Sequence, residues 1–94
     1  MFILNVDLDL KSGKEQNLEN TFKTVFVPAI SKQEGFSRTQ LLRPHNAGEP
    51  YRLLIEFQNQ AMQQKWVAAP LHQDVWPQME ANFQNYSVHN YDSV

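Results

Sequence analysis

The sequence contains no cysteine, and this absence limits how so short a chain can be stabilised. Its 94 residues predict a single domain, residues 1–94. A domain of this size buries only about 60–65% of its unfolded surface, which leaves a thin core. Disulfides and thiolate-bound metals are both excluded as extra stabilisation. Association with a second chain is the remaining way to bury more apolar surface.

An excess of basic residues and a long apolar run are also missing. Eight basic and ten acidic residues are spread along the chain, which gives a net charge of −2 without a basic stripe or a polybasic patch. The apolar start MFIL meets Asp7 and Asp9 too early for a signal-peptide core or a membrane span. We therefore expect a soluble, cytoplasmic protein that binds neither nucleic acid nor membranes.

Glycine and histidine are scarce, and this limits the cofactors that the chain can hold. The three glycines are scattered and form no phosphate-binding loop, so we expect neither flavin nor nicotinamide. His45, His72 and His89 fall in a predicted loop, helix and strand, without the close spacing of a metal site. No serine lies in a motif that marks a nucleophile. The sequence thus predicts a colourless protein with no cofactor and no metal.

What is present is an alternation of strand and helix patterns. Period-two alternation and apolar runs predict strands over residues 2–10, 36–43, 51–57 and 86–91. An apolar stripe with three- and four-residue spacing predicts a helix over 15–31, which Pro28 should kink or close early. Asn59 can cap a short helix that ends at Ala68, and Pro70 suits the first turn of another.

This order of elements predicts an α+β fold of the ferredoxin-like, split βαβ type. Two strand–helix–strand halves with right-handed crossovers place the helices on one face of a four-stranded antiparallel sheet. Leu53, Leu54 and Ile55 follow one another in a central strand, so apolar side chains leave both of its faces. A second sheet from an identical subunit would cover the bare face, with Arg52 and Glu56 pairing across that interface or at its rim.

Short motifs along the chain resemble a known family. They are SGK before the first helix, EGF after it, the strand end IEF, and Trp66 with His72 six residues later. In this order they resemble the antibiotic biosynthesis monooxygenase family of dimeric α+β barrels, over residues 2–91. The resemblance implies a homodimer with a pocket in each subunit between sheet and helices. Some relatives oxygenate polycyclic phenols or quinone precursors without a cofactor, and another branch degrades haem.

His72 and Trp66 are the candidate catalytic residues. A neutral imidazole at position 72 can remove a phenolic or carbon-bound proton and so create the anion that dioxygen attacks. The alternative is structural, with the His72 side chain capping the preceding loop or bonding a strand carbonyl. Trp66 can offer its ring face or donate its indole N–H to a substrate oxygen, or it can simply be core.

Four further residues are candidates for substrate binding. Trp76 can stack on an aromatic ring, although burial alone also explains it. Phe22 and Phe26 lie one turn apart on the first helix and face the sheet, as core or as ligand contacts. Asn5 can orient a ligand carbonyl if it points to the helices, or it is an interface amide. Its alternation with the neighbouring apolar residues favours the interface.

The haem-degrading branch of the family fits this sequence less well. That branch pairs a strand Asn with a Trp and a His from the second helical region. Alignment through SGK puts Val6, not Asn5, at the Asn place, and only a one-residue bulge would correct this. We therefore expect a cofactor-independent monooxygenase acting on an aromatic or quinol-like molecule. The alternative is a non-catalytic dimeric protein that binds a small molecule or fills its own pocket.

Overall fold

We describe a computed structural model of all 94 residues. Along the chain lie strand β1 (Phe2–Leu10), helix α1 (Glu15–Thr21), the π-helical segment η1 (Phe22–Phe26), helix α2 (Val27–Ile30), strands β2 (Phe36–Leu42) and β3 (Tyr51–Phe57), helices α3 (Gln60–Ala68) and α4 (Pro70–Glu80), and strand β4 (Phe83–Asp92). None of the helices has the length and apolar character needed to span a bilayer.

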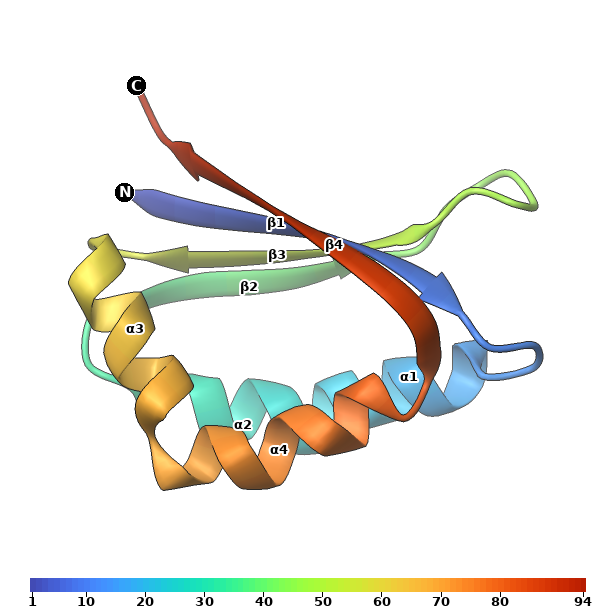
Figure 1. The fold of residues 1–94 in the computed structure, drawn as a ribbon, viewed down its shortest axis with the longest axis horizontal. Helices are drawn as coiled ribbons and strands as arrows, with labels where there is room; N and C mark the ends of the chain where they lie inside the picture. Colours follow the sequence, from blue (N-terminus) through green and yellow to red (C-terminus); the bar gives the residue numbers. More distant parts are fainter.

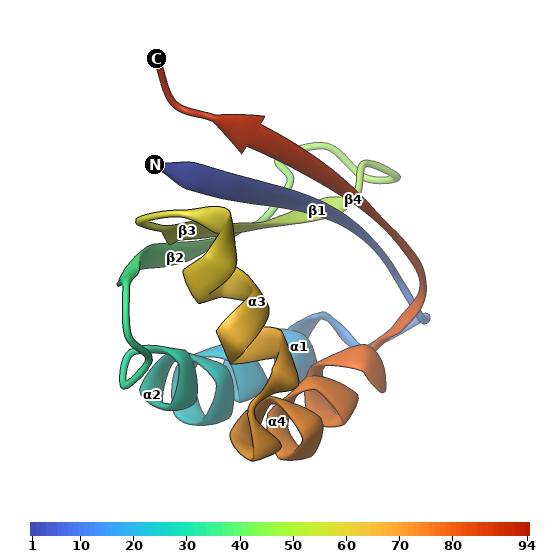
Figure 2. The ribbon, with the colours of Figure 1, turned by 60° about the vertical axis from the view of Figure 1, so that its left-hand side comes forward.

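The four strands form one antiparallel sheet in the order β2-β3-β1-β4, and every helix lies on the same side of it (Figure 1). This confirms the predicted ferredoxin-like α+β fold, and β3 is central as expected. Turning the molecule shows the opposite side of the sheet free of any helix (Figure 2). The structure therefore has two layers, and the core lies between them.

The pleat of the two central strands decides which side chains reach that core. In β1, Leu4, Val6 and Leu8 face the helices, and in β3 Leu53 and Ile55 do the same. Leu54 points to the other face, where it lies opposite Asn5 of β1 and Gln40 of β2. The apolar side chain of a central strand thus remains half-buried on a face that no helix covers.

Charged residues on this open face pair within the chain. The Nε of Arg52 lies 2.9 Å from an Asp7 carboxylate oxygen, and the Nε of Arg38 lies 2.8 Å from Glu56. Both pairs join neighbouring strands, so Arg52 and Glu56 have partners within the chain and do not need a second subunit to supply them. The sheet register, which the sequence does not specify, brings the partners together.

The predicted first helix is interrupted by a wide turn. Within η1 the backbone N–H of Val27 donates to the carbonyl of Phe22, five residues back, as in a π-helix. Pro28 has no N–H to give to the carbonyl of Thr24, and the wider turn before it accommodates the missing bond. The effect of Pro28 therefore lies upstream of it, and helical structure continues to Ile30.

Helices α3 and α4 begin where the sequence predicts, but the strand that follows them begins earlier than predicted. The Asn59 side chain accepts a hydrogen bond from the Met62 N–H at 2.9 Å, and Pro70 opens α4, both as predicted. Strand β4 begins at Phe83 instead of residue 86. Asn82 makes this early start possible, because its buried amide donates to the carbonyls of Gln78 and Met79 and accepts from Asn17 at 2.6 Å.

Gly35, in the turn before β2, provides a stability test. Its φ is +77°, and a Cβ there would lie 2.7 Å from Cγ of Met62. Gly35→Ala should lower the free energy of unfolding by about 2–3 kcal/mol, through backbone strain plus overpacking. Gly13→Ala is the control, because Gly13 has the same φ with nothing within 4 Å. Equal losses in urea titrations of the two variants would contradict the contact argument.

Candidate active site around His72

The link between α3 and α4 brings the two candidate catalytic residues together. Helix α3 ends at Ala68, the next residue Ala69 has an extended backbone (φ −69°, ψ 143°), and Pro70 starts α4 at once. This sharp change of direction sets the His72 ring edge-on against Trp66, with ring centroids 5.0 Å apart. Trp76, one turn further along α4, stacks on His72 with ring centroids 5.9 Å apart and an interplanar angle of 14°. The imidazole thus contacts both indoles.

His72 carries an unsatisfied polar atom at this place. Its Nδ1 is buried and has no hydrogen-bond partner, which is uncommon for a buried polar atom. Neither structural role weighed for the side chain is present: the backbone N–H of His72 bonds Ala69, but the ring caps nothing. Burial lowers the pKa of His72 below its usual 6.5, because a charged imidazolium loses hydration there. At neutral pH the ring is therefore an uncharged base.

The aromatic contacts continue from Trp66 and Trp76 to the first helical region. Phe26, fully buried in η1, lies 6.3 Å from Trp66 and 6.4 Å from Trp76. Phe22 stacks on Phe26 at 5.9 Å and 22°. We call these five residues, Phe22, Phe26, Trp66, His72 and Trp76, the His72 cluster. All five were candidates from the sequence, and the fold brings them into one continuous set of contacts.

Strand β4 adds two aromatic residues that sequence reasoning did not assign to the site. Trp76 lies 5.8 Å from Phe83 and 6.0 Å from Tyr86, which extend the aromatic contacts to the sheet edge. Helical spacing from Pro70 predicts Phe83 on the same stripe as His72 and Trp76, but α4 ends at Glu80 and Phe83 starts β4. Only the aromatic character of Phe83 and Tyr86 could have indicated a role in the site. Their position beside Trp76 results from the pairing of β4 with β1, which sequence spacing does not reveal.

The His72 cluster is closely packed. Trp66 is 2% exposed and Phe26 is fully buried. The main surface hollows are lined elsewhere, and Phe22 is the one member of the cluster that borders any of them. None of these hollows is lined by His72, Trp66 or Trp76, whereas His72 and Trp76 are themselves half-buried.

Asn5 lies on the opposite face of the sheet from the cluster. It pairs with Leu54 and His89 on the open face, as the strand alternation favoured, and its amide lies 3.4 Å from Asp7. Val6 points to the helices instead and is 2% exposed. The one register shift of β1 falls between Asp9 and Leu10, so no bulge turns Asn5 toward His72.

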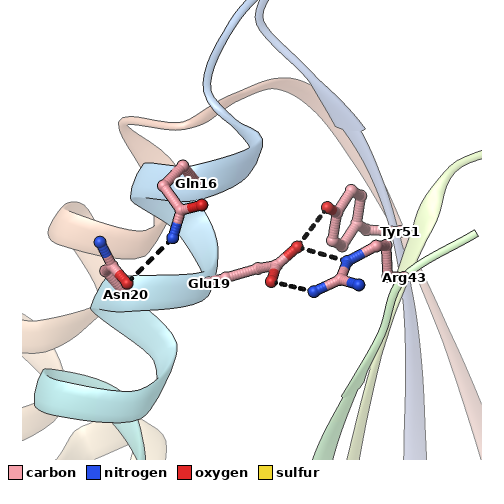
Figure 3. A network of polar contacts seen from close by, with 5 residues as sticks. All are labelled: Gln16, Glu19, Asn20, Arg43 and Tyr51. Carbon is pink, nitrogen blue, oxygen red and sulfur yellow. Dashed lines mark hydrogen bonds and ion pairs between the residues drawn. The ribbon is translucent and has the colours of Figure 1, made fainter.

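A polar network joins α1 to the strand side of the fold (Figure 3), and its members Glu19, Arg43 and Tyr51 line a hollow together with Phe22. The Arg43 guanidinium donates to both carboxylate oxygens of Glu19, at 2.8 Å from Nε and 2.5 Å from Nη2, and the Tyr51 hydroxyl donates at 2.6 Å. We call these three residues the Glu19 clamp. No local pattern predicts this clamp, because Arg43 and Tyr51 lie 24 and 32 residues from Glu19 along the chain.

The Glu19 clamp makes a pH-dependent contribution to stability. Hydrogen bonds from Arg43 and Tyr51 lower the pKa of Glu19 from 4.5 to about 2 in the folded chain. The folded state thus favours the ionised carboxylate, so the contribution is complete above pH 4.5 and is lost as the pH falls toward 2. Glu19→Gln should cost about 1–2 kcal/mol at pH 7 and flatten this acid limb in urea titrations. An unchanged limb would contradict the pairing, and Glu34→Gln, an exposed pair with Lys65, is the control.

The fold and the site together define the class of this protein: a ferredoxin-like α+β domain with an aromatic, histidine-containing cluster between sheet and helices. The family model for antibiotic biosynthesis monooxygenases matches residues 1–77. The chain therefore belongs to that family, which confirms the resemblance. No protein with a curated description matches the chain in sequence.

Solved structures share the fold across nearly the whole chain. SnoaB, a cofactor-independent oxygenase from Streptomyces nogalater, is 16% identical with a TM-score of 0.83, covering 99% of this chain and 93% of its own. A variant of MhuD with two manganese protoporphyrin IX molecules bound per active site is 21% identical with a TM-score of 0.83, covering 100% and 95%. A conserved protein from Methanosarcina mazei is 16% identical with a TM-score of 0.81, covering 100% and 94%. At these identities the similarity establishes the fold alone.

Proposed function

We propose that this protein is a cofactor-independent monooxygenase that oxidises an aromatic or quinol-like molecule in the His72 cluster, as a homodimer. The observation that carries the proposal is the buried Nδ1 of His72, which has no partner inside the protein. A neutral imidazole in contact with two indole rings is a proton acceptor in a site suited to flat, apolar substrates. Membership of the family supports the reaction type.

The chemistry requires little from the protein beyond a base and a dry site. His72 accepts a proton from a phenol or an activated CH₂ of the substrate, and the resulting carbanion gives its electrons to dioxygen with formation of a C–O bond. The imidazolium returns the proton to the peroxide, which loses water and leaves a carbonyl. For an anthrone-type substrate the sum is CH₂ + O₂ → C=O + H₂O, so the substrate supplies all four electrons. Trp66 and Trp76 would hold the ring system beside His72.

Oxygen uptake with an anthrone-type substrate tests this proposal. We expect the purified protein to consume one O₂ per quinone formed, well above the spontaneous rate, and to place one atom of ¹⁸O₂ in the new carbonyl. Heat-denatured protein is the control for autoxidation. Uptake no faster than this control, with a series of anthrones and quinols, would contradict the proposal.

A non-catalytic binding protein is the second candidate, and the close packing of the His72 cluster favours it. In that case Trp66 and Phe26 fill the pocket themselves, and no oxygen is consumed with any substrate.

The haem-degrading function of another branch has less support, because Asn5 lies on the far side of the sheet from His72. We expect the purified protein to be colourless and added haemin to give no stoichiometric Soret shift. A saturable shift lost in His72→Ala would favour haem.

A further inference from the structure

A small hollow lies where the His72 cluster meets the Glu19 clamp. It has a volume of about 150 Å³ and is lined by Glu19, Phe22, Lys23, Leu41, Arg43 and Tyr51. We call it the Phe22 pocket. A cavity of roughly 150 Å³ with apolar walls accommodates one benzene ring. Phe22 and Leu41 supply apolar walls here, and the remaining lining residues are polar or charged.

The aromatic wall of the Phe22 pocket is continuous with the His72 cluster. Phe22 stacks on Phe26, and Phe26 contacts both tryptophans. A ring bound against Phe22 would therefore occupy the outermost place of this aromatic series. A neighbouring open hollow of about 720 Å³ also borders on Glu19, Arg43 and Tyr51, so a larger ligand can extend outward from the pocket.

The hydrogen-bonding groups of the pocket select for an acceptor. Both carboxylate oxygens of Glu19 are already engaged by Arg43 and Tyr51. Arg43 uses two of the five N–H groups of a guanidinium for Glu19, and its side chain is 69% exposed. Lys23 is an exposed residue and lines the same pocket. Donors are thus in surplus, and two cations face one carboxylate.

We propose that the Phe22 pocket binds one aromatic ring bearing an anionic oxygen, with the ring against Phe22 and the oxygen on Arg43 and Lys23. A carboxylate or a phenolate supplies this chemistry. The further step, that such a ring belongs to the substrate of the enzyme, rests on the proposed function. The binding itself does not depend on it.

Three one-ring probes that differ in charge test the proposal: benzoate, benzyl alcohol and protonated benzylamine. In NMR titrations at low salt, we expect benzoate to shift resonances of residues 19–23 and 41–43 and to bind at least about tenfold more tightly than benzylammonium. Equal affinities of benzoate and benzylammonium would overturn the proposal. So would benzoate shifts centred elsewhere on the molecule.

Matched variants locate the interaction. Arg43→Ala and Lys23→Ala should each weaken benzoate severalfold, and Phe22→Leu should weaken all three probes alike. Arg38→Ala is the control for arginine, since Arg38 makes a similar exposed pair with Glu56. Phe36→Leu is the control for the ring, because Phe36 packs on Phe57 at the other end of β2. Lys23→Ala alters an exposed side chain, so this variant should stay folded and remain informative even if another variant is unstable. Full benzoate affinity in both Lys23→Ala and Arg43→Ala would refute the site.

The outcome can be separated from that of the proposed oxygenation. Benzoate binding should be unchanged in His72→Ala, because His72 does not line the pocket. A protein that binds benzoate there but consumes no oxygen would retain the pocket and lose the proposed reaction. A protein that oxidises anthrones with unchanged KM in Lys23→Ala, and does not bind benzoate, would retain the proposed reaction and lose the pocket.

Discussion

Leu54→Asp should dissociate the proposed homodimer into monomers. Leu54 lies at the centre of the open sheet face, opposite Asn5 and Gln40, and no helix covers it. A stable interface buries about 800 Å² per partner, and a second copy placed on this face would supply the apolar cover that the thin core lacks. By two-fold symmetry the substitution would introduce two buried carboxylates. Unpaired charges of this kind cost several kcal/mol, so the dimer dissociation constant should rise by about two orders of magnitude or more.

Light scattering and sedimentation velocity at low micromolar concentration would measure this change. Val67→Asp is a suitable control, because Val67 is an apolar side chain of α3 that is 41% exposed. Circular dichroism should show both variants folded. A wild type that is monomeric and fully folded would refute the interface, and a dimeric Leu54→Asp variant would place it on another surface.

The charged residues of this face make the expected interface tolerable. Asp7 accepts hydrogen bonds from Arg52 and Asn5, and Glu56 accepts one from Arg38, so these charges are already paired before a partner arrives. Covering a paired charge costs less than covering a free one. The open face therefore combines apolar Ile3 and Leu54 with satisfied polar groups, a mixture suited to an interface between folded subunits.

The fold could be predicted from the sequence wherever a local pattern coincided with burial. Leu53, Leu54 and Ile55 identified a central strand because each face of that strand demands its own apolar residues. Asn59 and Pro70 marked helix starts because caps act through neighbouring backbone groups. The predicted start of β4, residue 86, was wrong because residues 83–85 show no clear alternation of apolar and polar side chains. The strand begins earlier because the buried hydrogen bonds of Asn82 hold the chain in place there.

The candidate site was predictable only in part, for a related reason. Helical spacing is enough to associate His72 with Trp76 and Phe22 with Phe26, which lie one turn apart. The contact between Trp76 and Tyr86 and the Glu19 clamp depend on strand register and on how α1 lies over the sheet. Sequence spacing carries no information about those distances, and the π-turn further shifts Phe22 and Phe26 relative to a regular helix.

Replacement of His72 should have the largest effect on the proposed reaction. A positioned general base contributes about 10²–10⁴-fold, so His72→Phe should reduce oxygen uptake by at least a hundredfold. Phenylalanine keeps an aromatic ring in contact with Trp66 and Trp76 but cannot accept a proton, which separates loss of the base from loss of packing. His45→Phe, in the exposed loop after β2, is the matched control and should retain full activity.

The pH dependence of the wild type gives an independent check on the same residue. Only neutral His72 accepts a proton, and burial lowers its pKa below 6.5. The rate should therefore be constant near pH 7 and fall on acidification through a pKa below 6.5. The free energy of unfolding should also decrease over this range, because the unfolded chain binds the proton more readily than the folded chain. Rates taken from initial uptake, with folding monitored by tryptophan fluorescence, distinguish the two effects. Full activity in His72→Phe, or an acid limb that persists in the residual activity of that variant, would remove His72 as the base.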